Sequence, residues 1–146
     1  MNRFLSMTLL ASLISFQAHA ACTDFAGTWK GTCQNNSGVV RHNTVTIMQN
    51  RCDTIVMENR IFPIGQIIET RVPSNPGESN VAYEVMNFVN NCADLKYLYT
   101  SIASKPGQPP VRIDLATTYK RNGNFMTSEL VQSQNNYRET CQYFLQ

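Results

Sequence analysis

The chain has 146 residues, of which 42% are hydrophobic and 15% charged, and its 12 basic and 10 acidic residues leave a formal charge of +2. This length suits one domain and is too short for an alternating strand–helix barrel enzyme, which needs roughly 250 residues. The composition excludes a disordered polyelectrolyte, and the near-neutral charge gives no electrostatic reason to expect nucleic acid as a partner.

Residues 1–20 have the features of an export signal. Arg3 precedes an uncharged apolar stretch, and the tripeptide Ala-His-Ala at 18–20 is a small-x-small cleavage site. The stretch is too short to remain as a membrane-spanning helix, which needs about 20 apolar residues. We therefore expect a signal peptide at 1–20 and one domain at 21–146. The protein is expected to be periplasmic or extracellular, with no transmembrane segment.

The rest of the chain has the periodicity of β-strands. In the first run apolar or small residues alternate with polar ones, and such a period of two is typical of a half-buried strand. The clearest alternation falls between residues 111 and 120, and no window has a convincing helical period. The predicted strands are Phe25–Cys33, Asn43–Gln49, Thr54–Asn59, Gly65–Val72, Asn80–Asn90, Leu95–Ala103, Val111–Lys120, Asn124–Ser133 and Tyr137–Leu145.

Turn-forming residues separate these runs. Asn122-Gly123 lies between two alternating segments and predicts a type I′ hairpin. The segments 35–38, 73–77 and 105–110 are rich in Asn, Gly, Pro and Ser and are predicted loops. Even spacing with short connections indicates sequential antiparallel strands.

A meander of eight or nine strands has two edges that must be protected. Closure into a barrel removes both edges, and a barrel of about eight strands has an interior that side chains fill or that holds one small ligand. We therefore predict an all-β fold: one antiparallel meander barrel of eight or nine strands, stabilised by disulfides. A two-sheet β-sandwich is the alternative.

All five cysteines follow the leader, and export makes disulfides the expected state. Their spacing lacks the short Cys-x-x-Cys type of pair that structural zinc sites use, so no metal site is expected. If the first two runs form a hairpin, Cys22 and Cys52 meet at one end, and Cys33 lies at the other end near Cys92 and Cys141. We predict Cys22–Cys52, and then Cys33 with either Cys141 or Cys92. A lipid anchor on Cys22 is a minor alternative.

The segment 24–29, Asp-Phe-Ala-Gly-Thr-Trp, resembles the opening of lipocalins and their calycin relatives. In that family a Gly-x-Trp motif places tryptophan across the closed end of a barrel, and an arginine from late in the chain packs over it. The resemblance implies this role for Trp29, with Arg121 and Arg138 as candidates for the arginine. The family's Thr-Asp-Tyr signature is absent, because the nearest match at 117–119 lacks the aspartate.

Other small exported proteins share parts of this pattern. Periplasmic inhibitors of secreted metalloproteases resemble the chain in size and in the Gly-x-Trp strand, and they insert a free N-terminal strand into the protease. Here only residues 21–24 precede the first run, and a bridged Cys22 would tie them down. The segments 45–52 and 62–65 resemble small secreted bacterial proteins of unknown function, which implies no activity.

No set of residues in the sequence indicates catalysis. The chain lacks the nucleophile-elbow, zinc-protease, P-loop and dinucleotide-binding motifs, and His42 is the one histidine beyond the leader. Carboxylate pairs such as Glu58 with Glu69, or Asp114 with Glu129, are expected on the outer face. We expect no enzyme activity and no cofactor.

Aromatic residues concentrate in the second half of the chain. Packing in the barrel is their ordinary role, whereas a cavity lined by rings and hydroxyls would orient a small apolar molecule. We expect Trp29, Tyr97, Tyr99 and Tyr119 to line such a cavity. The sequence thus predicts a secreted or periplasmic binding protein for a small apolar ligand. The alternative is a protein-interaction or protease-inhibitor-like barrel that acts through its loops and outer surface.

Overall fold

The computed structural model describes residues 21–72 and 76–146. The expected leader at 1–20 and the first three residues of the loop at 73–77 lie outside the described residues. The described chain forms strands and turns and contains no helix. The strands are β1 (Gly27–Asn35), β2 (Val40–Asn50), β3 (Thr54–Met57), β4 (Arg60–Pro63), β5 (Ile67–Val72), β6 (Ser79–Val89), β7 (Asp94–Ser104), β8 (Val111–Asn122), β9 (Phe125–Gln132) and β10 (Tyr137–Leu145).

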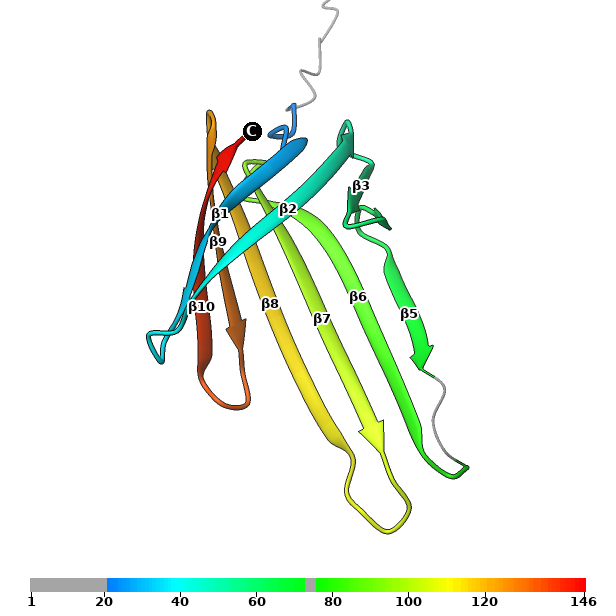
Figure 1. Cartoon of the computed structure of the whole chain (residues 1–146). Helices are drawn as coiled ribbons and strands as arrows, with labels where there is room; N and C mark the ends of the chain where they lie inside the picture. The colour runs from blue at the N-terminus through cyan, green and yellow to red at the C-terminus, as the bar shows by residue number, and fades with distance from the viewer. Residues whose placement is uncertain (1–20, 73–75) are drawn as a thin grey trace, which may run out of the picture.

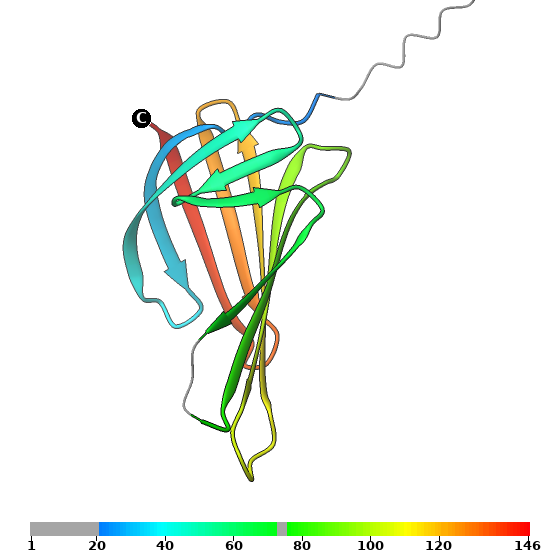
Figure 2. The same ribbon diagram turned by 90° about the vertical axis from the view of Figure 1, so that its right-hand side faces the viewer.

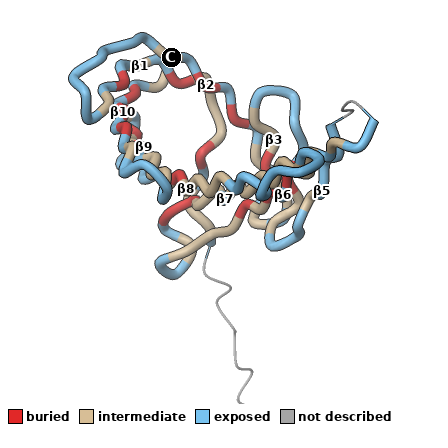
Figure 3. Tube along the Cα trace, turned by 90° about the horizontal axis from the view of Figure 1, so that it is seen from below, coloured by how far each residue is buried: buried red, intermediate tan, exposed pale blue. Residues whose placement is uncertain are grey.

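All strands belong to one antiparallel sheet in the order β4-β3-β2-β1-β10-β9-β8-β7-β6-β5 (Figure 1). Because the first strand pairs with the last, the sheet curls round on itself, as the view along the strands shows (Figure 3). The edge strands β4 and β5 are not paired with each other, and we call this gap in the backbone ladder the seam. The predicted all-β meander barrel is confirmed, with ten strands rather than eight or nine and with closure left incomplete at the seam.

The extra strand follows a turn within the run predicted at 54–59. Glu58 and Asn59 have φ angles of 50° and 67°. Two central residues with positive φ characterise the type I′ hairpin, whose twist matches that of the flanking strands. The chain therefore reverses after Met57, and β4 pairs with β3 instead of extending it.

The hairpin predicted at Asn122-Gly123 is present, but its turn is displaced by one residue. Asn122 is the last residue of β8 and pairs with Phe125, so Gly123 and Asn124 form the turn. Gly123 has a φ of 60°, whereas Asn124 is not among the described residues with positive φ. Glycine with positive φ at the first turn position is the type II′ pattern, so the predicted type I′ turn was wrong.

The barrel has a wide and a narrow region. Strands β2, β3 and β4 cross in front of β8, β9 and β10 and enclose the upper part (Figure 2). Strands β6, β7 and β8 run past the ends of β9 and β10 and form a ribbon below it (Figure 1).

A tryptophan packs at the end of the barrel where β1 begins. Trp29 is fully buried, and its Nε1 donates to the Phe25 carbonyl at 2.9 Å. The Arg121 guanidinium carbon lies 5.1 Å from the centre of the indole ring, a cation–π contact worth roughly 0.5–2 kcal/mol. Of the two arginines that the resemblance suggested, Arg121 makes this contact, while Arg138 pairs with Glu129 at 3.3 Å on the outer face.

Two disulfides tie the sheet together. Cys22 is bonded to Cys52, and Cys33 to Cys141, which is its direct cross-strand partner. The predicted Cys22–Cys52 pair is therefore present, and Cys141 rather than Cys92 is the partner of Cys33. Cys92 is a free, half-buried thiol. Two disulfides are typical of proteins in oxidising, exported environments.

Within residues 21–72 and 76–146 there is no helix of the length and hydropathy that a bilayer-spanning helix requires.

Candidate functional site: a cavity inside the barrel

A cavity of about 290 Å³ lies inside the upper barrel, lined by side chains of β2, β3, β4 and β6 to β10. This space equals the liquid volume of roughly ten water molecules at about 30 Å³ each. It lies at the lower end of the range in which proteins hold small ligands.

The strand register brings the lining side chains together in rows. In one row Met86, Tyr97, Thr117, Leu130 and Glu139 are successive cross-strand partners on five neighbouring strands. Since directly opposed residues of a sheet point to the same face, a single row supplies an apolar, an aromatic, a hydroxyl and a charged group.

A second row lies two residues nearer the tryptophan end of the barrel. Its members are Tyr119, Ser128, Cys141, Cys33 and Arg41, each opposite the next on β8, β9, β10, β1 and β2. The Cys33–Cys141 disulfide thus lies within the row, and Cys141 lines the cavity. The second row adds an aromatic ring, a hydroxyl and a guanidinium to the wall.

The seam is bridged on the inside by an ion pair. Arg60 of β4 donates from Nη1 to Glu84 Oε2 at 2.6 Å and from Nη2 to Glu84 Oε1 at 2.5 Å, although β4 and β6 are not paired in the sheet. The Tyr97 hydroxyl donates to the same Oε2 at 2.6 Å. The Glu84 side chain is 2% exposed and that of Arg60 is 49% exposed, so a buried carboxylate is held by a guanidinium at the surface of the cavity.

Two further contacts close the seam. The Gly65 backbone N–H donates to the Met86 carbonyl at 2.9 Å, and the rings of Phe62 and Tyr97 meet edge to face at 5.6 Å between centroids. Burial, followed by the hydrogen bond to Glu84, raises the pKa of Tyr97, so its hydroxyl remains a donor at neutral pH. The seam is thus closed by side-chain contacts and one backbone hydrogen bond where the ladder between β4 and β5 is interrupted.

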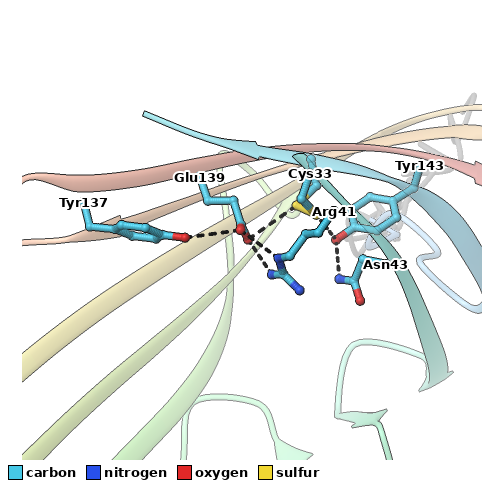
Figure 4. Close-up of polar contacts among 7 residues, drawn as sticks. Cys33, Arg41, Asn43, Tyr137, Glu139 and Tyr143 are labelled. Atoms are coloured by element: carbon cyan, nitrogen blue, oxygen red, sulfur yellow. Dashed lines mark hydrogen bonds and ion pairs between the residues drawn. A yellow bond between two sulfur atoms is a disulfide. The ribbon is translucent and has the colours of Figure 1, made fainter. Parts of the chain in front are cut away.

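A second ion pair lies on the wall formed by β2 and β10. Arg41 donates from Nε and Nη2 to the two carboxylate oxygens of Glu139 at 2.9 and 2.7 Å (Figure 4). Tyr137 donates to Glu139 at 3.3 Å, and Asn43 Nδ2 donates to the Tyr143 hydroxyl at 3.0 Å. The hydrogen bonds from Arg41 hold the pKa of Glu139 below its ordinary value, so the carboxylate stays ionised despite its burial.

The same wall contains the one cluster of metal-type donors in the described part of the chain. Cys33, Cys141 and Glu139 place a ligand-type atom each within 4.8 Å of one another. The two sulfurs are bonded to each other, and the carboxylate is engaged by Arg41. This donor set is therefore already satisfied.

The structure separates the aromatic residues that the sequence grouped together. Tyr97 and Tyr119 line the cavity. Trp29 packs against Arg121 at the end of the barrel and is not among the lining residues. Tyr99 is opposite Glu84, one row nearer the ribbon than Tyr97, and does not line the cavity either.

Sequence reasoning missed Glu139, which lines the cavity, and Glu84, which holds the lining residues Arg60 and Tyr97. Glu84 lies between Ala82 and Met86 in the alternation of β6, at a position that points inward, and Glu139 occupies the equivalent position beside Cys141. A charged residue at a position where the alternation of the strand expects a buried side chain could have indicated these two glutamates.

Comparison with protein-family models, with curated proteins and with solved structures found no match for this chain.

Proposed function

We propose that this chain is an exported binding protein whose barrel holds a small, mostly apolar ligand. The observation that carries the proposal is the cavity of about 290 Å³, walled by the rings of Phe62, Tyr97, Tyr119 and Tyr143. Ligand sites of proteins are commonly concave and apolar, with a few fixed polar groups. The lipocalin-like opening of the sequence and the Arg121 contact on its tryptophan support the same proposal.

The charged groups of the cavity suit binding better than proton transfer. Glu84 accepts from Arg60 and Tyr97, and Glu139 accepts from Arg41 and Tyr137. Carboxylates held in this way orient the wall. We infer a fixed lining rather than an acid–base pair.

Export to the periplasm or the extracellular space is part of the proposal. It is supported by the charged, apolar and small-x-small pattern of residues 1–20 and by the two disulfides. Mass spectrometry of the intact exported protein tests it. A chain beginning at Ala21 is expected. The Cys22 sulfur is bonded to Cys52, so a lipid adduct on Cys22 would contradict both the disulfide and the expected cleavage.

A fluorescent apolar probe tests binding in the cavity. N-phenylnaphthylamine should brighten on addition to the protein and lose this response in Leu130→Trp, which fills the cavity. Leu98→Trp is the matched control, because Leu98 is 37% exposed on the outer face of the sheet. An equal response in all three proteins, at comparable melting temperatures, would show that the probe binds elsewhere and would refute the proposal.

A second candidate function, a protein-interaction module, is favoured by an apolar row on the outer face. Ile67, Val85, Leu98, Ala116 and Val131 are successive cross-strand partners from β5 to β9, and Ile67 is 71% exposed. Exposed apolar patches commonly mark interaction sites. A cross-linked complex from the native compartment that disappears in Leu98→Lys, while probe binding persists, would favour this function over the first.

A further inference from the structure

Two hydroxyl side chains of the cavity wall have no partner. Thr117 and Ser128 are only 6% and 5% exposed, and neither hydroxyl makes a hydrogen bond within residues 21–72 and 76–146. Every fully enclosed side-chain nitrogen or oxygen in that part of the chain does have a partner. The oxygens of Thr117 and Ser128 therefore keep some accessible surface, and both residues line the cavity, although Ser128 also borders a hollow beside Thr127 and Glu129. Hydroxyls so placed are available to hydrogen-bond a ligand that enters the cavity.

The two arginines of the wall also have N–H groups to spare. Arg41 uses Nε and Nη2 on Glu139, which leaves Nη1 free of that contact. Arg60 uses Nη1 and Nη2 on Glu84, which leaves Nε. Both arginines line the cavity, and their side chains are 54% and 49% exposed. Since each of the two carboxylates already accepts three hydrogen bonds, the cavity offers donors more readily than acceptors.

The charges of the wall disfavour a charged ligand of either sign. Each arginine is matched by one buried glutamate at 2.7 or 2.5 Å. An anion would approach Glu84 and Glu139, and it would also meet Glu58, which is exposed at the rim. A cation would approach Arg41 and Arg60. The spare arginine N–H groups can donate to an anion, but two arginines against three glutamates leave one net negative charge. Bringing an anion out of water into this surrounding is therefore unfavourable, and a cation finds no unpaired carboxylate inside the cavity among the described residues.

We propose that the cavity selects an uncharged molecule of about ten non-hydrogen atoms, mainly hydrocarbon, that carries one hydrogen-bond acceptor such as a ketone or aldehyde oxygen. The acceptor meets the hydroxyls of Thr117 and Ser128, and the hydrocarbon part packs on Phe62, Met86 and Tyr97. This inference rests on the proposed function, since it defines the ligand of the same cavity.

Four ligands of nearly equal size test the selection. Acetophenone, ethylbenzene, benzoate and benzylammonium differ in the group attached to one phenyl ring, and their dissociation constants are measured by NMR titration of the intact protein. Acetophenone should bind about 3- to 10-fold more tightly than ethylbenzene, the value of one hydrogen bond. Both charged ligands should bind at least about tenfold more weakly than acetophenone.

Variants then locate the acceptor. Thr117→Val keeps the shape of the side chain and removes the hydroxyl. It should weaken acetophenone about 3- to 10-fold and leave ethylbenzene unchanged. Thr118→Val is the matched control, because Thr118 is the next residue on β8 and points outward, and it should change neither affinity. Thr117→Val should also fold normally, because its hydroxyl has no partner to lose.

The outcomes separate this inference from the proposed function. Benzoate or benzylammonium binding as tightly as acetophenone, or ethylbenzene equalling it, would overturn the selection and leave a binding cavity in place. An equal loss of acetophenone and ethylbenzene in Thr117→Val would also overturn it. The absence of binding by all four ligands would overturn both.

Discussion

The Arg41–Glu139 pair allows a quantitative test of how the cavity wall is held. Glu139 is 6% exposed in its side chain and accepts two hydrogen bonds from Arg41. In Arg41→Met the Tyr137 hydroxyl at 3.3 Å is the remaining partner of the carboxylate. Removing one member of a buried pair typically costs about 3–5 kcal/mol. Because Arg41 is 54% exposed and water can reach the site, we expect about 2–3 kcal/mol at pH 7.

A second variant separates the lost pair from other effects of the substitution. In Arg41→Met with Glu139→Gln the charge is removed together with its partner, and the amide can still accept from Tyr137. Replacing both members of a buried ion pair by uncharged residues often changes the free energy of unfolding very little. The double variant should therefore recover at least about 1 kcal/mol of the loss seen in the single variant.

The pH dependence of the free energy of unfolding is an independent test of the Arg41–Glu139 pair. Arg41 holds the folded-state pKa of Glu139 below its unfolded value of about 4.3, so the pair stabilises the fold above that value. The stabilisation is lost as the pH falls through the lower, folded-state pKa. The gap between wild type and Arg41→Met should therefore be largest near pH 7 and shrink below about pH 4.

Urea unfolding at pH 7 and pH 3.5 measures these differences. Arg138→Met is the matched control, because Arg138 and Glu129 are 63% and 50% exposed and a surface pair contributes about 0–1 kcal/mol. A loss in Arg41→Met no larger than in this control, or a gap that does not depend on pH, would refute the assigned role of the pair.

Three further changes test the frame around the cavity. The double substitution Cys33→Ala with Cys141→Ala removes a bond between residues 108 apart in sequence. By the chain-entropy model it should lower the free energy of unfolding by about 4–5 kcal/mol, measured in urea. A decrease below about 1 kcal/mol would contradict this. Gly31→Ala would place a Cβ 1.9 Å from the Gln142 carbonyl oxygen. It should lower the free energy of unfolding by at least about 1–3 kcal/mol, and an unchanged midpoint of urea unfolding would contradict this. Arg121→Met should alter the emission of the single tryptophan and cost roughly 0.5–2 kcal/mol, and an unchanged spectrum would count against the cation–π contact.

Strand positions were predictable from the sequence because alternate residues are buried where strands enclose the upper barrel, as in β10 and in β8 around Thr117 and Tyr119. The alternation at 111–120 corresponds to β8, which extends to Asn122, and the last predicted run coincides with β10. Burying alternate side chains imposes a period of two on each strand, and this period is visible without the partner strand.

The turn at the end of the run at 54–59, and the strand β4 that follows it, were not predictable from composition. The turn contains Glu58, which is not a typical type I′ residue, and no glycine. What determines the turn is pairing across it, where Ile55 meets the buried Phe62. The gain from burying these two side chains together is a tertiary effect, which local turn preferences do not contain.

The candidate site, too, contains residues that strand periodicity could predict and residues that it could not. Inward-facing tyrosines could be proposed from strand periodicity alone, and Tyr97 and Tyr119 do line the cavity. The ion pairs could not, because Arg41 and Glu139 are 98 residues apart and meet only when β2 and β10 flank β1. Periodicity assigns a residue to a face, but it does not say which residue lies across the barrel.

The contact between β1 and β10 determines which side chains line the cavity. A shift of one residue in this pairing would turn Thr140 and Gln142 inward in place of Cys141 and Tyr143. Two features oppose such a shift. The Cys33–Cys141 bond joins direct cross-strand partners, and the missing side chain at Gly31 admits the β10 backbone at one position of the ladder. We therefore expect the disulfide to affect the proposed binding as well as stability, since it fixes the wall that carries the ion pair.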